Sequence, residues 1–329
     1  MAMDAFSGGY DNVEKMKNMY DKRAPLAEAV RRFLKDGITI SIGGFGDTRI
    51  PIASIHQIIR QGARGLTISV PSNSICCELL AGAMILNSNH LSIHRIEISW
   101  HDNEKFYKTA LLSYLIRKKM VLLDEYSAPS MLARYQARAI GVPFLPIKED
   151  GSDERERGNR GKVSVCPFTG EKIRLVPACN PDLALIHVQA ADIYGNCRIF
   201  GDLCTCPHVA QASVNTIVTT EQVIDNSAIQ NYPNLTTIPY HVVDVVVDQP
   251  FGSTPAACYG NYEVDSSQLQ EFRSIGEDFC RTGNTDKLRN YYNQSIFDIE
   301  NFDDFLEQKP YPILHNLCQL ESRQSIILD

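Results

Sequence analysis

The sequence predicts an α/β protein: a mostly parallel sheet with helices on both faces. Short β-branched and aliphatic runs alternate with longer segments whose apolar residues have helical spacing. Such alternation is typical of parallel strands that helices cover on both sides. The chain has 329 residues, of which 44% are hydrophobic and 22% charged, so it can bury a large core.

The first predicted helix begins at Pro25 and ends at the pair Asp36-Gly37. Its apolar residues recur at helical spacing and are Leu26, Ala29, Val30, Phe33 and Leu34. A β-branched strand at 38–42 then runs straight into a glycine-rich turn. Pro51 follows where a first helical turn tolerates proline, so the order here is strand, glycine turn, helix.

The same rhythm continues along the chain. The pattern predicts strands at 66–70, 91–100, 119–123, 183–188, 214–219 and 241–248, and helices at 52–59, 75–84 and 130–140. Connections between parallel strands of one sheet should be right-handed crossovers.

Domain organisation follows from where this rhythm stops. Residues 1–22 are predicted to be an N-terminal extension, and 23–329 a single domain. Within it, 148–162 carries dense charge of both signs and should form an exposed loop. Residues 266–329 have helical spacing and should form a C-terminal helical extension on the core.

Composition excludes several classes of protein. A formal net charge of -7 argues against a nucleic-acid partner, because no broad positive field is available for phosphates. The absence of a long apolar run argues against a membrane span or a signal peptide. Ten cysteines without metal-type spacing indicate reduced thiols and a cytoplasmic location.

The turn Gly43-Gly44-Phe45 stands at the end of a buried strand, where open α/β folds bind ligands. Its spacing does not match the dinucleotide fingerprint, because Arg49 occupies the place of the third glycine. Two interpretations stay open from spacing alone: backbone N–H groups that bind a ligand, or a tight turn that needs positive φ.

The string DGITISIGGFGDTRIP at 36–51 resembles the N-terminal signature of A chains of family I coenzyme A transferases, with Ser41 and Arg49 as departures from it. The ending Arg-x-Pro is similar to the branch of that family that contains the glutaconate transferase and the steroid-ring hydrolase A subunits, rather than the acetoacetate-type enzymes. Further blocks extend the resemblance: VPFLPI at 142–147, DLALIHVQAADIYGNCRIFG at 182–201, NTIVTTEQVI at 215–224 and VDVVVDQPFGSTPAACYGNYEVD at 243–265.

The resemblance implies the family fold and transfer of CoA between short-chain, dicarboxylic acids through an enzyme thioester. The nucleophilic glutamate of the family lies on a B (beta) subunit in a Ser-Glu-Asn-Gly-like string, which this chain lacks. A B-subunit partner and a hetero-oligomer of A2B2 size or larger are therefore expected. Acyl-CoA and carboxylic acids would be the substrates, with no tightly bound cofactor and no metal.

Three alternatives stay open. In hydrolase relatives a glutamate of the A chain precedes the block at 142–147, but gap-free matching places Ala128 there, three residues after Glu125. A related decarboxylase carries a cysteine on its B chain, and a non-catalytic acyl-CoA binding subunit would have no such partner. The neighbouring reading frame discriminates between these cases.

The predicted site joins two turns that follow neighbouring strands. Gly43, Gly44 and Phe45 would offer N–H groups, and Ser72, Asn73 and Ser74 would hold the polar end of the acyl group. Arg49 either pairs with a distal carboxylate or is a structural residue of the turn. Trp100 ends a strand at the sheet edge and is a candidate ligand contact, whereas His187 and Gln189 are predicted to be hydrogen-bonded scaffold residues.

Overall fold

The computed structural model describes residues 18–71, 75–99, 109–149, 161–309, 314–315 and 317–318. The larger sheet contains β1 (Thr39–Ile42), β2 (Leu66–Val70), β3 (Ile93–Ile98), β4 (Leu122–Glu125), β8 (Leu183–Asp192), β9 (Cys197–Arg198), β10 (Asn215–Ile224) and β11 (Val245–Asp248). The smaller sheet contains β5 (Phe144–Lys148), β6 (Lys162–Val165) and β7 (Lys172–Pro177). The helices are α1 (Leu26–Phe33), α2 (Ile52–Gln61), α3 (Ile75–Leu86), α4 (Ala110–Arg117), α5 (Ala128–Ala139), α6 (Cys206–Ala212), α7 (Asn226–Asn231), α8 (Ser266–Thr282), α9 (Asp286–Tyr292) and α10 (Phe302–Glu307), with short 3-10 turns and a π-helical turn, η4 (Asn293–Phe297).

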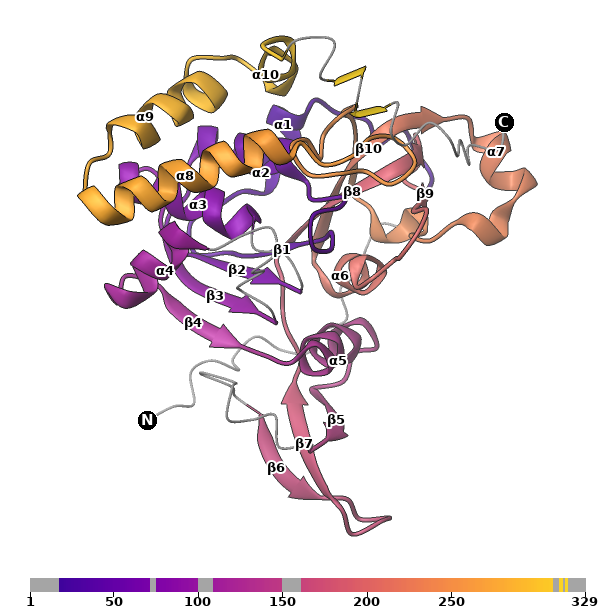
Figure 1. Cartoon of the computed structure of the whole chain (residues 1–329). Coiled ribbons are helices and arrows are strands. Elements are labelled where there is room, and N and C mark those ends of the chain that lie inside the picture. The colour runs from indigo at the N-terminus through magenta and orange to yellow at the C-terminus, as the bar shows by residue number, and fades with distance from the viewer. Residues whose placement is uncertain are drawn as a thin grey trace.

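The larger sheet has the order β11-β10-β8-β1-β2-β3-β4, and these strands are parallel, while β9 pairs with β8 in antiparallel fashion (Figure 1). The chain starts at β1, moves outward to β4, and returns to β8 on the other side of β1. The order therefore reverses between β1 and β8. Open α/β sheets bind ligands at such a switch point, beyond the carboxyl ends of the strands.

Both faces of this sheet are buried, as the sequence predicted. In β8, Leu183 and Leu185 contribute to one hydrophobic core, while Ala184 and Ile186 contribute to the other. This follows from the two-residue period of a strand. The first core packs under α1 to α4 with α8 and α9 outside them, and the second packs under α5 and α6 (Figure 1).

A three-stranded antiparallel sheet, here called the arm (β5, β6 and β7), projects from the body below α5 (Figure 1). The sequence did not predict it. The ends of the expected charged loop at 148–162 are strand residues, because Lys148 ends β5 and Lys162 begins β6. The rest of that loop, residues 150–160, lies outside the described residues.

The predicted class, a mostly parallel sheet flanked by helices with additional C-terminal helices, is confirmed. Some bounds differ from the predictions: β4 begins at Leu122 rather than 119, and β10 continues to Ile224. Within the described part of the chain, no helix combines the length and apolarity that crossing a membrane requires.

Candidate functional site at the switch point of the sheet

The glycine turn, residues 43–49, follows β1 directly and lies at the switch point. The Gly43 N–H donates to the carbonyl of Leu185 in β8 at 2.9 Å, and Phe45 and Thr48 exchange N–H···O bonds at 3.0 and 2.9 Å. Gly44 has φ +91°, and a Cβ there would lie 2.8 Å from the Arg49 carbonyl oxygen. Only glycine fits this position, because both the positive φ and the close backbone approach exclude a side chain.

The N–H groups of this turn are not all available to a ligand. Gly44 donates its N–H to Cys206 Sγ at 3.2 Å, so the N–H groups of Gly43, Gly44 and Phe45 are all used within the chain. The N–H groups of Gly46 and Asp47, at the tip, have no hydrogen-bond partner among the described residues. Donation to a ligand from this turn is therefore assigned to its tip.

Arg49 is buried and held by contacts within this chain. The residue is 1% exposed, and its φ is +53°. One guanidinium nitrogen donates to the Asp202 carbonyl, and another lies 4.0 Å from Cys206 Sγ. Because the group is buried within this chain alone, the arrangement favours the structural alternative over a clamp for a distal carboxylate.

Two loops meet the glycine turn, and the three segments together form what we call the switch-point face. Ala257, in the loop that follows β11, donates its N–H to Asp47 O and accepts from Arg49 N–H, both at 2.7 Å. Gln189 donates to the carbonyls of Phe200 and Tyr259 at 3.0 Å each, which ties the second loop, residues 200–206, to the first. The exposed apolar side chains on this face are Phe45 (41%), Leu203 (36%) and Tyr259 (38%).

A buried hydroxyl cluster supports the strands beneath the turn. Ser41 in β1 and Ser69 in β2 are partners in register, and their hydroxyls lie 2.5 and 2.8 Å from the Tyr135 hydroxyl of α5. Burial raises the pKa of Tyr135, so its hydroxyl stays protonated. Ser41 is a polar residue in an otherwise apolar part of the strand. Its hydroxyl therefore connects α5 to β1, in the middle of the sheet.

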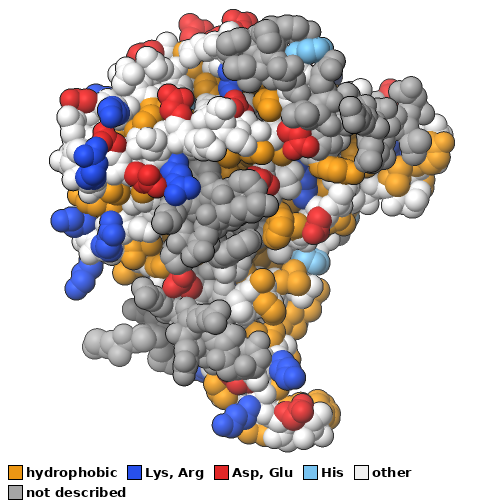
Figure 2. Space-filling view, in the orientation of Figure 1, with side chains coloured by type: hydrophobic (Ala, Val, Ile, Leu, Met, Phe, Trp, Pro, Cys, Tyr) orange, Lys and Arg blue, Asp and Glu red, His pale blue; other side chains and the backbone are white. Residues whose placement is uncertain are grey.

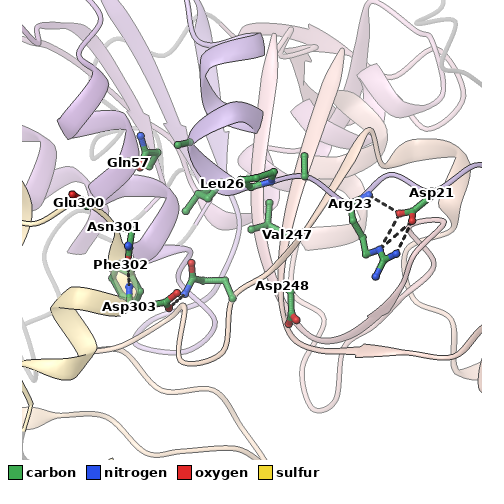
Figure 3. A pocket seen from close by; sticks show the side chains of 14 residues that line it. Asp21, Arg23, Leu26, Gln57, Val247, Asp248, Glu300, Asn301, Phe302 and Asp303 are labelled. Carbon is green, nitrogen blue, oxygen red and sulfur yellow. Dashed lines mark hydrogen bonds and ion pairs between the residues drawn. The ribbon is translucent and has the colours of Figure 1, made fainter.

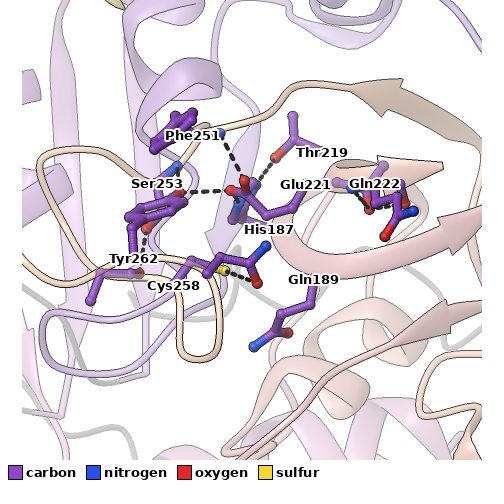
Figure 4. Close-up of polar contacts among 12 residues, drawn as sticks. His187, Gln189, Thr219, Glu221, Gln222, Phe251, Ser253, Cys258 and Tyr262 are labelled. Atoms are coloured by element: carbon purple, nitrogen blue, oxygen red, sulfur yellow. Dashed lines mark hydrogen bonds and ion pairs between the residues drawn. The ribbon is translucent and has the colours of Figure 1, made fainter. Parts of the chain in front are cut away.

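A second buried cluster lies where β8 and β10 meet the loop 249–262 (Figure 4). His187 Nε2 lies 2.5 Å from Glu221 Oε1, and the Tyr262 hydroxyl donates to the same oxygen at 2.6 Å. Glu221 Oε2 accepts from the Phe251 N–H at 2.8 Å. As predicted, His187 is a hydrogen-bonded core residue, with Nδ1 2.8 Å from Thr219 Oγ1.

His187, Glu221 and Cys258 also form the type of donor set that holds a metal ion. The 2.5 Å separation of the histidine nitrogen and the carboxylate oxygen is that of a hydrogen bond. Two ligands of a tetrahedral zinc ion would be about 3.3 Å apart. In this arrangement the cluster is hydrogen-bonded, and its carboxylate is already surrounded by donors.

A separate hollow of about 630 Å³ lies at the outer side of the sheet, between the N-terminal segment, the end of β11 and α10 (Figure 3). Its lining includes the carboxylates of Asp248, Glu300 and Asp303, while the guanidinium of Arg23 is paired with Asp21 at 2.7 Å. The excess of negative charge disfavours the phosphates and carboxylates of an acyl-CoA. The switch-point face is therefore the better candidate.

The predicted site residues fall into three groups. Gly43, Gly44, Phe45 and Arg49 come together at the switch point, with β1 and β2 adjacent as expected. Ser72, Asn73, Ser74 and Trp100 lie outside the described residues. Glu125 is half-buried and ends β4, shortly before α5. In the sheet, β2 and β3 separate β4 from β1 and its glycine turn.

Sequence reasoning missed Glu221, Tyr262 and Cys206. Glu221 carried one usable signal: it follows the buried residues Thr219 and Thr220 and is the one charged residue of its strand. A carboxylate in such a run must find donors from elsewhere in the chain. The sequence does not say which donors these are.

These features define an α/β chain with a candidate ligand site at the switch point of an open sheet. The chain belongs to the coenzyme A transferase family, whose model matches residues 23–249. It is an enzyme chain of the A type, since A chains of two-subunit CoA-transferases are among its relatives.

An uncharacterized protein of Archaeoglobus fulgidus is 31% identical over 89% of this chain, and the chain spans 63% of that protein. The A subunit of 3-oxoadipate CoA-transferase from Pseudomonas knackmussii is 33% identical, over 77% of this chain and 88% of that relative. The crystal structure of glutaconate coenzyme A-transferase from Acidaminococcus fermentans superposes with a TM-score of 0.81 and 26% identity, over 90% of this chain and 95% of that one.

Proposed function

We propose that this chain is the A subunit of a heteromeric CoA transferase that moves CoA between short-chain acids through a glutamate of its partner. The observation that carries this proposal concerns the buried carboxylates of the described residues, all of which are hydrogen-bonded or ion-paired. They are Glu78, Glu97, Asp124, Asp192, Asp265 and the side chain of Glu221.

A carboxylate held in this way is a poor nucleophile, because its lone pairs are occupied and the acyl carbonyl cannot approach it. Glu97 illustrates the point: it pairs with Arg134 at 2.9 Å, and both side chains are less than a tenth exposed. Formation of an enzyme thioester needs a carboxylate that substrate can reach. We infer that the partner chain supplies it.

This chain would contribute the hydrogen-bond donors that stabilise the reacting carbonyl of the substrate. The N–H groups of Gly46 and Asp47, which no described residue accepts, suit an oxyanion that develops on the acyl carbonyl. Phe45, which the turn leaves exposed, offers an apolar contact to the acyl chain. Ser72, Asn73, Ser74 and Trp100 stay in the proposal as contacts for the polar end of the substrate.

The partner would cover the switch-point face and the arm. The arm exposes several large apolar side chains, and Figure 2 shows a hydrophobic area where the arm joins the body. These side chains are Phe144 (44%), Val163 (55%), Val165 (61%) and Phe168 (93%). Val163 and Val165 lie on one face of this sheet, Phe144 lies on the other, and Phe168 is in the turn after β6. Exposed apolar side chains on a small projecting sheet indicate a protein interface. We further propose an A2B2 or larger assembly and a cytoplasmic location.

A dicarboxylic substrate is supported by the similar proteins, because 3-oxoadipate and glutaconate are both dicarboxylic acids. CoA enters as a substrate, and the proposed chemistry on this chain uses backbone N–H groups, apolar contacts and the polar contacts proposed for Ser72, Asn73 and Ser74.

The proposal is tested by co-expressing the chain with the B-type chain from the neighbouring reading frame. CoA exchange between glutaconyl-CoA and acetate is then measured, with release of carbon dioxide and free CoA followed in parallel. Exchange without either side reaction supports a transferase. Decarboxylation or hydrolysis in its place would reassign the complex, and binding without turnover would indicate a non-catalytic acyl-CoA binding chain.

Arg49→Lys should lower kcat/KM by about tenfold, and equally for mono- and dicarboxylic acceptors, because the single nitrogen of a lysine does not replace the two guanidinium nitrogens that contact Asp202 and Cys206. Steady-state rates with acetate and glutarate as acceptors measure this. A KM raised for the dicarboxylic acid alone would restore the carboxylate clamp.

Glu125→Gln should leave the exchange rate of the complex within about tenfold of wild type, a cost below about 1.4 kcal/mol. Glu125 ends a strand before α5 and is not among the residues of the switch-point face. Single-turnover exchange measures the effect, and a thousandfold loss would assign the nucleophile to this chain.

A further inference from the structure

Glu221 is a carboxylate that the proposed chemistry does not use, although it lies close to the switch point. Its side chain is 4% exposed, and its oxygens accept from Tyr262, Phe251 and His187. Two of these donors are the two ends of the loop that follows β11. The carboxylate therefore joins β8 and β10 of the sheet to both ends of this loop (Figure 4).

Near Glu221, residues of this loop also make hydrogen bonds and a ring contact with one another. The Tyr262 hydroxyl accepts from the Ser253 N–H at 3.0 Å, and the Tyr262 ring stacks on Phe251 with centroids 4.9 Å apart. Ser253 Oγ donates to the Ala257 carbonyl at 3.0 Å. Burial and the negative charge of Glu221 raise the pKa of Tyr262, so its hydroxyl remains a donor.

The middle of the loop is hydrogen-bonded to the glycine turn. Ala257 bonds to Asp47 and Arg49 through its N–H and its carbonyl, and the Gly252 carbonyl accepts the N–H of Ala53 in the first turn of α2. This path of the backbone needs glycine at position 252, since a Cβ there would lie 2.9 Å from the His187 ring. The chain of contacts thus runs from Glu221 through the loop to the tip of the glycine turn.

We propose that Glu221, acting through Tyr262 and the loop 249–262, is a positioning residue that fixes the N–H groups of Gly46 and Asp47 against the reacting carbonyl. This inference rests on the proposed function. Glu221 touches neither substrate nor the reacting atoms. Its effect is to hold the donors in one place, and donors fixed in advance stabilise transition-state charge more than ground-state binding.

Glu221→Gln and Tyr262→Phe in the A–B complex test the proposal. Glutamine keeps the shape but turns one acceptor into a donor, so it loses at least one of the bonds to the loop; phenylalanine keeps the stacking on Phe251 and loses the hydroxyl. We expect kcat to fall about thirtyfold and about tenfold, respectively, with KM for acyl-CoA changed by less than about threefold.

Hydrogen exchange provides a readout that does not depend on turnover. In both variants the amides of Arg49 and Ala257 should exchange at least about tenfold faster, while amides of β1 stay protected. The matched control is Tyr292→Phe, which removes a buried hydroxyl that donates to Leu79 O under the C-terminal helices. It should lower the melting temperature without changing kcat or exchange at 45–49.

The outcomes separate the two proposals. A wild-type complex without CoA transfer refutes the proposed function, and faster exchange at 45–49 in the variants would still support the positioning role. Unchanged exchange there, or a loss of protection that spreads equally to β1, overturns the role of Glu221. A raised KM with kcat preserved would also overturn it, since the residue would then act on substrate binding.

Discussion

The purified chain by itself should exchange CoA between acids at least about a thousandfold more slowly than the complex with its partner. The reason is the engagement of its buried carboxylates, of which Glu97 and Asp124 are ion-paired at 2.9 and 2.5 Å. No acidic side chain buried in the described part of the chain is left for attack on a thioester. Exchange of labelled CoA between glutaconyl-CoA and acetate measures the difference.

Two controls accompany this experiment. Adding separately purified B-type chain to the inactive A chain should restore exchange, which shows that the A chain was folded. A complex whose B chain carries glutamine in place of the nucleophilic glutamate should assemble and stay inactive. If the A chain alone turned over within about tenfold of the complex, the nucleophile would belong to this chain and the proposal would fail.

The central sheet could be predicted from the sequence because its signals are local. The strand at 38–42 and the strand at 66–70 are each an apolar run followed at once by a turn, and the structure has β1 and β2 in nearly the same places. In a parallel sheet with both faces buried, every strand is such an apolar run. The order of the strands, including the reversal between β1 and β8, depends on pairing between distant segments and has no local signal in the pattern.

The arm could not be predicted in the same way. Its strands are short, β5 contains Pro146, and β5 and β6 flank the highly charged segment that the sequence assigns to a loop. Their residues stay partly exposed, so the apolar signal is weak. Antiparallel pairing with β7 stabilises them, and that pairing joins Leu145 to Val176 across a long stretch of chain.

The sequence indicates a position for the candidate site but not how its residues are held. A glycine turn after a buried strand indicates where a ligand binds. The direction of the Arg49 side chain depends on Asp202, which is 153 residues away in sequence, and the role of Glu221 depends on a loop that folds back from β11. Contacts of this kind are set by tertiary structure, and a single sequence does not contain a local signal for them.

Gly44→Ala should reduce kcat/KM of the complex at least about a hundredfold. A methyl group there would lie 2.8 Å from the Arg49 carbonyl oxygen and 3.0 Å from that of Thr48, so the turn has to open. Opening would move the tip amides and break the bond from the Gly44 N–H to Cys206 Sγ. Strain from φ +91° adds roughly 1–3 kcal/mol of destabilisation. Steady-state kinetics and thermal unfolding of the complex measure the two effects.

Gly37→Ala is the matched control for this substitution. Gly37 lies before the opposite end of β1, has φ +78°, and has no neighbouring atom within 4 Å of an added Cβ. It should therefore show the backbone strain without the collision, with a loss of stability of roughly 1–3 kcal/mol from strain alone and with kcat/KM within about threefold of wild type. If Gly44→Ala were as active as Gly37→Ala, the geometry of the turn would not matter to the reaction. The switch-point face would then be a structural feature, and the acyl-CoA site would have to lie elsewhere on the complex.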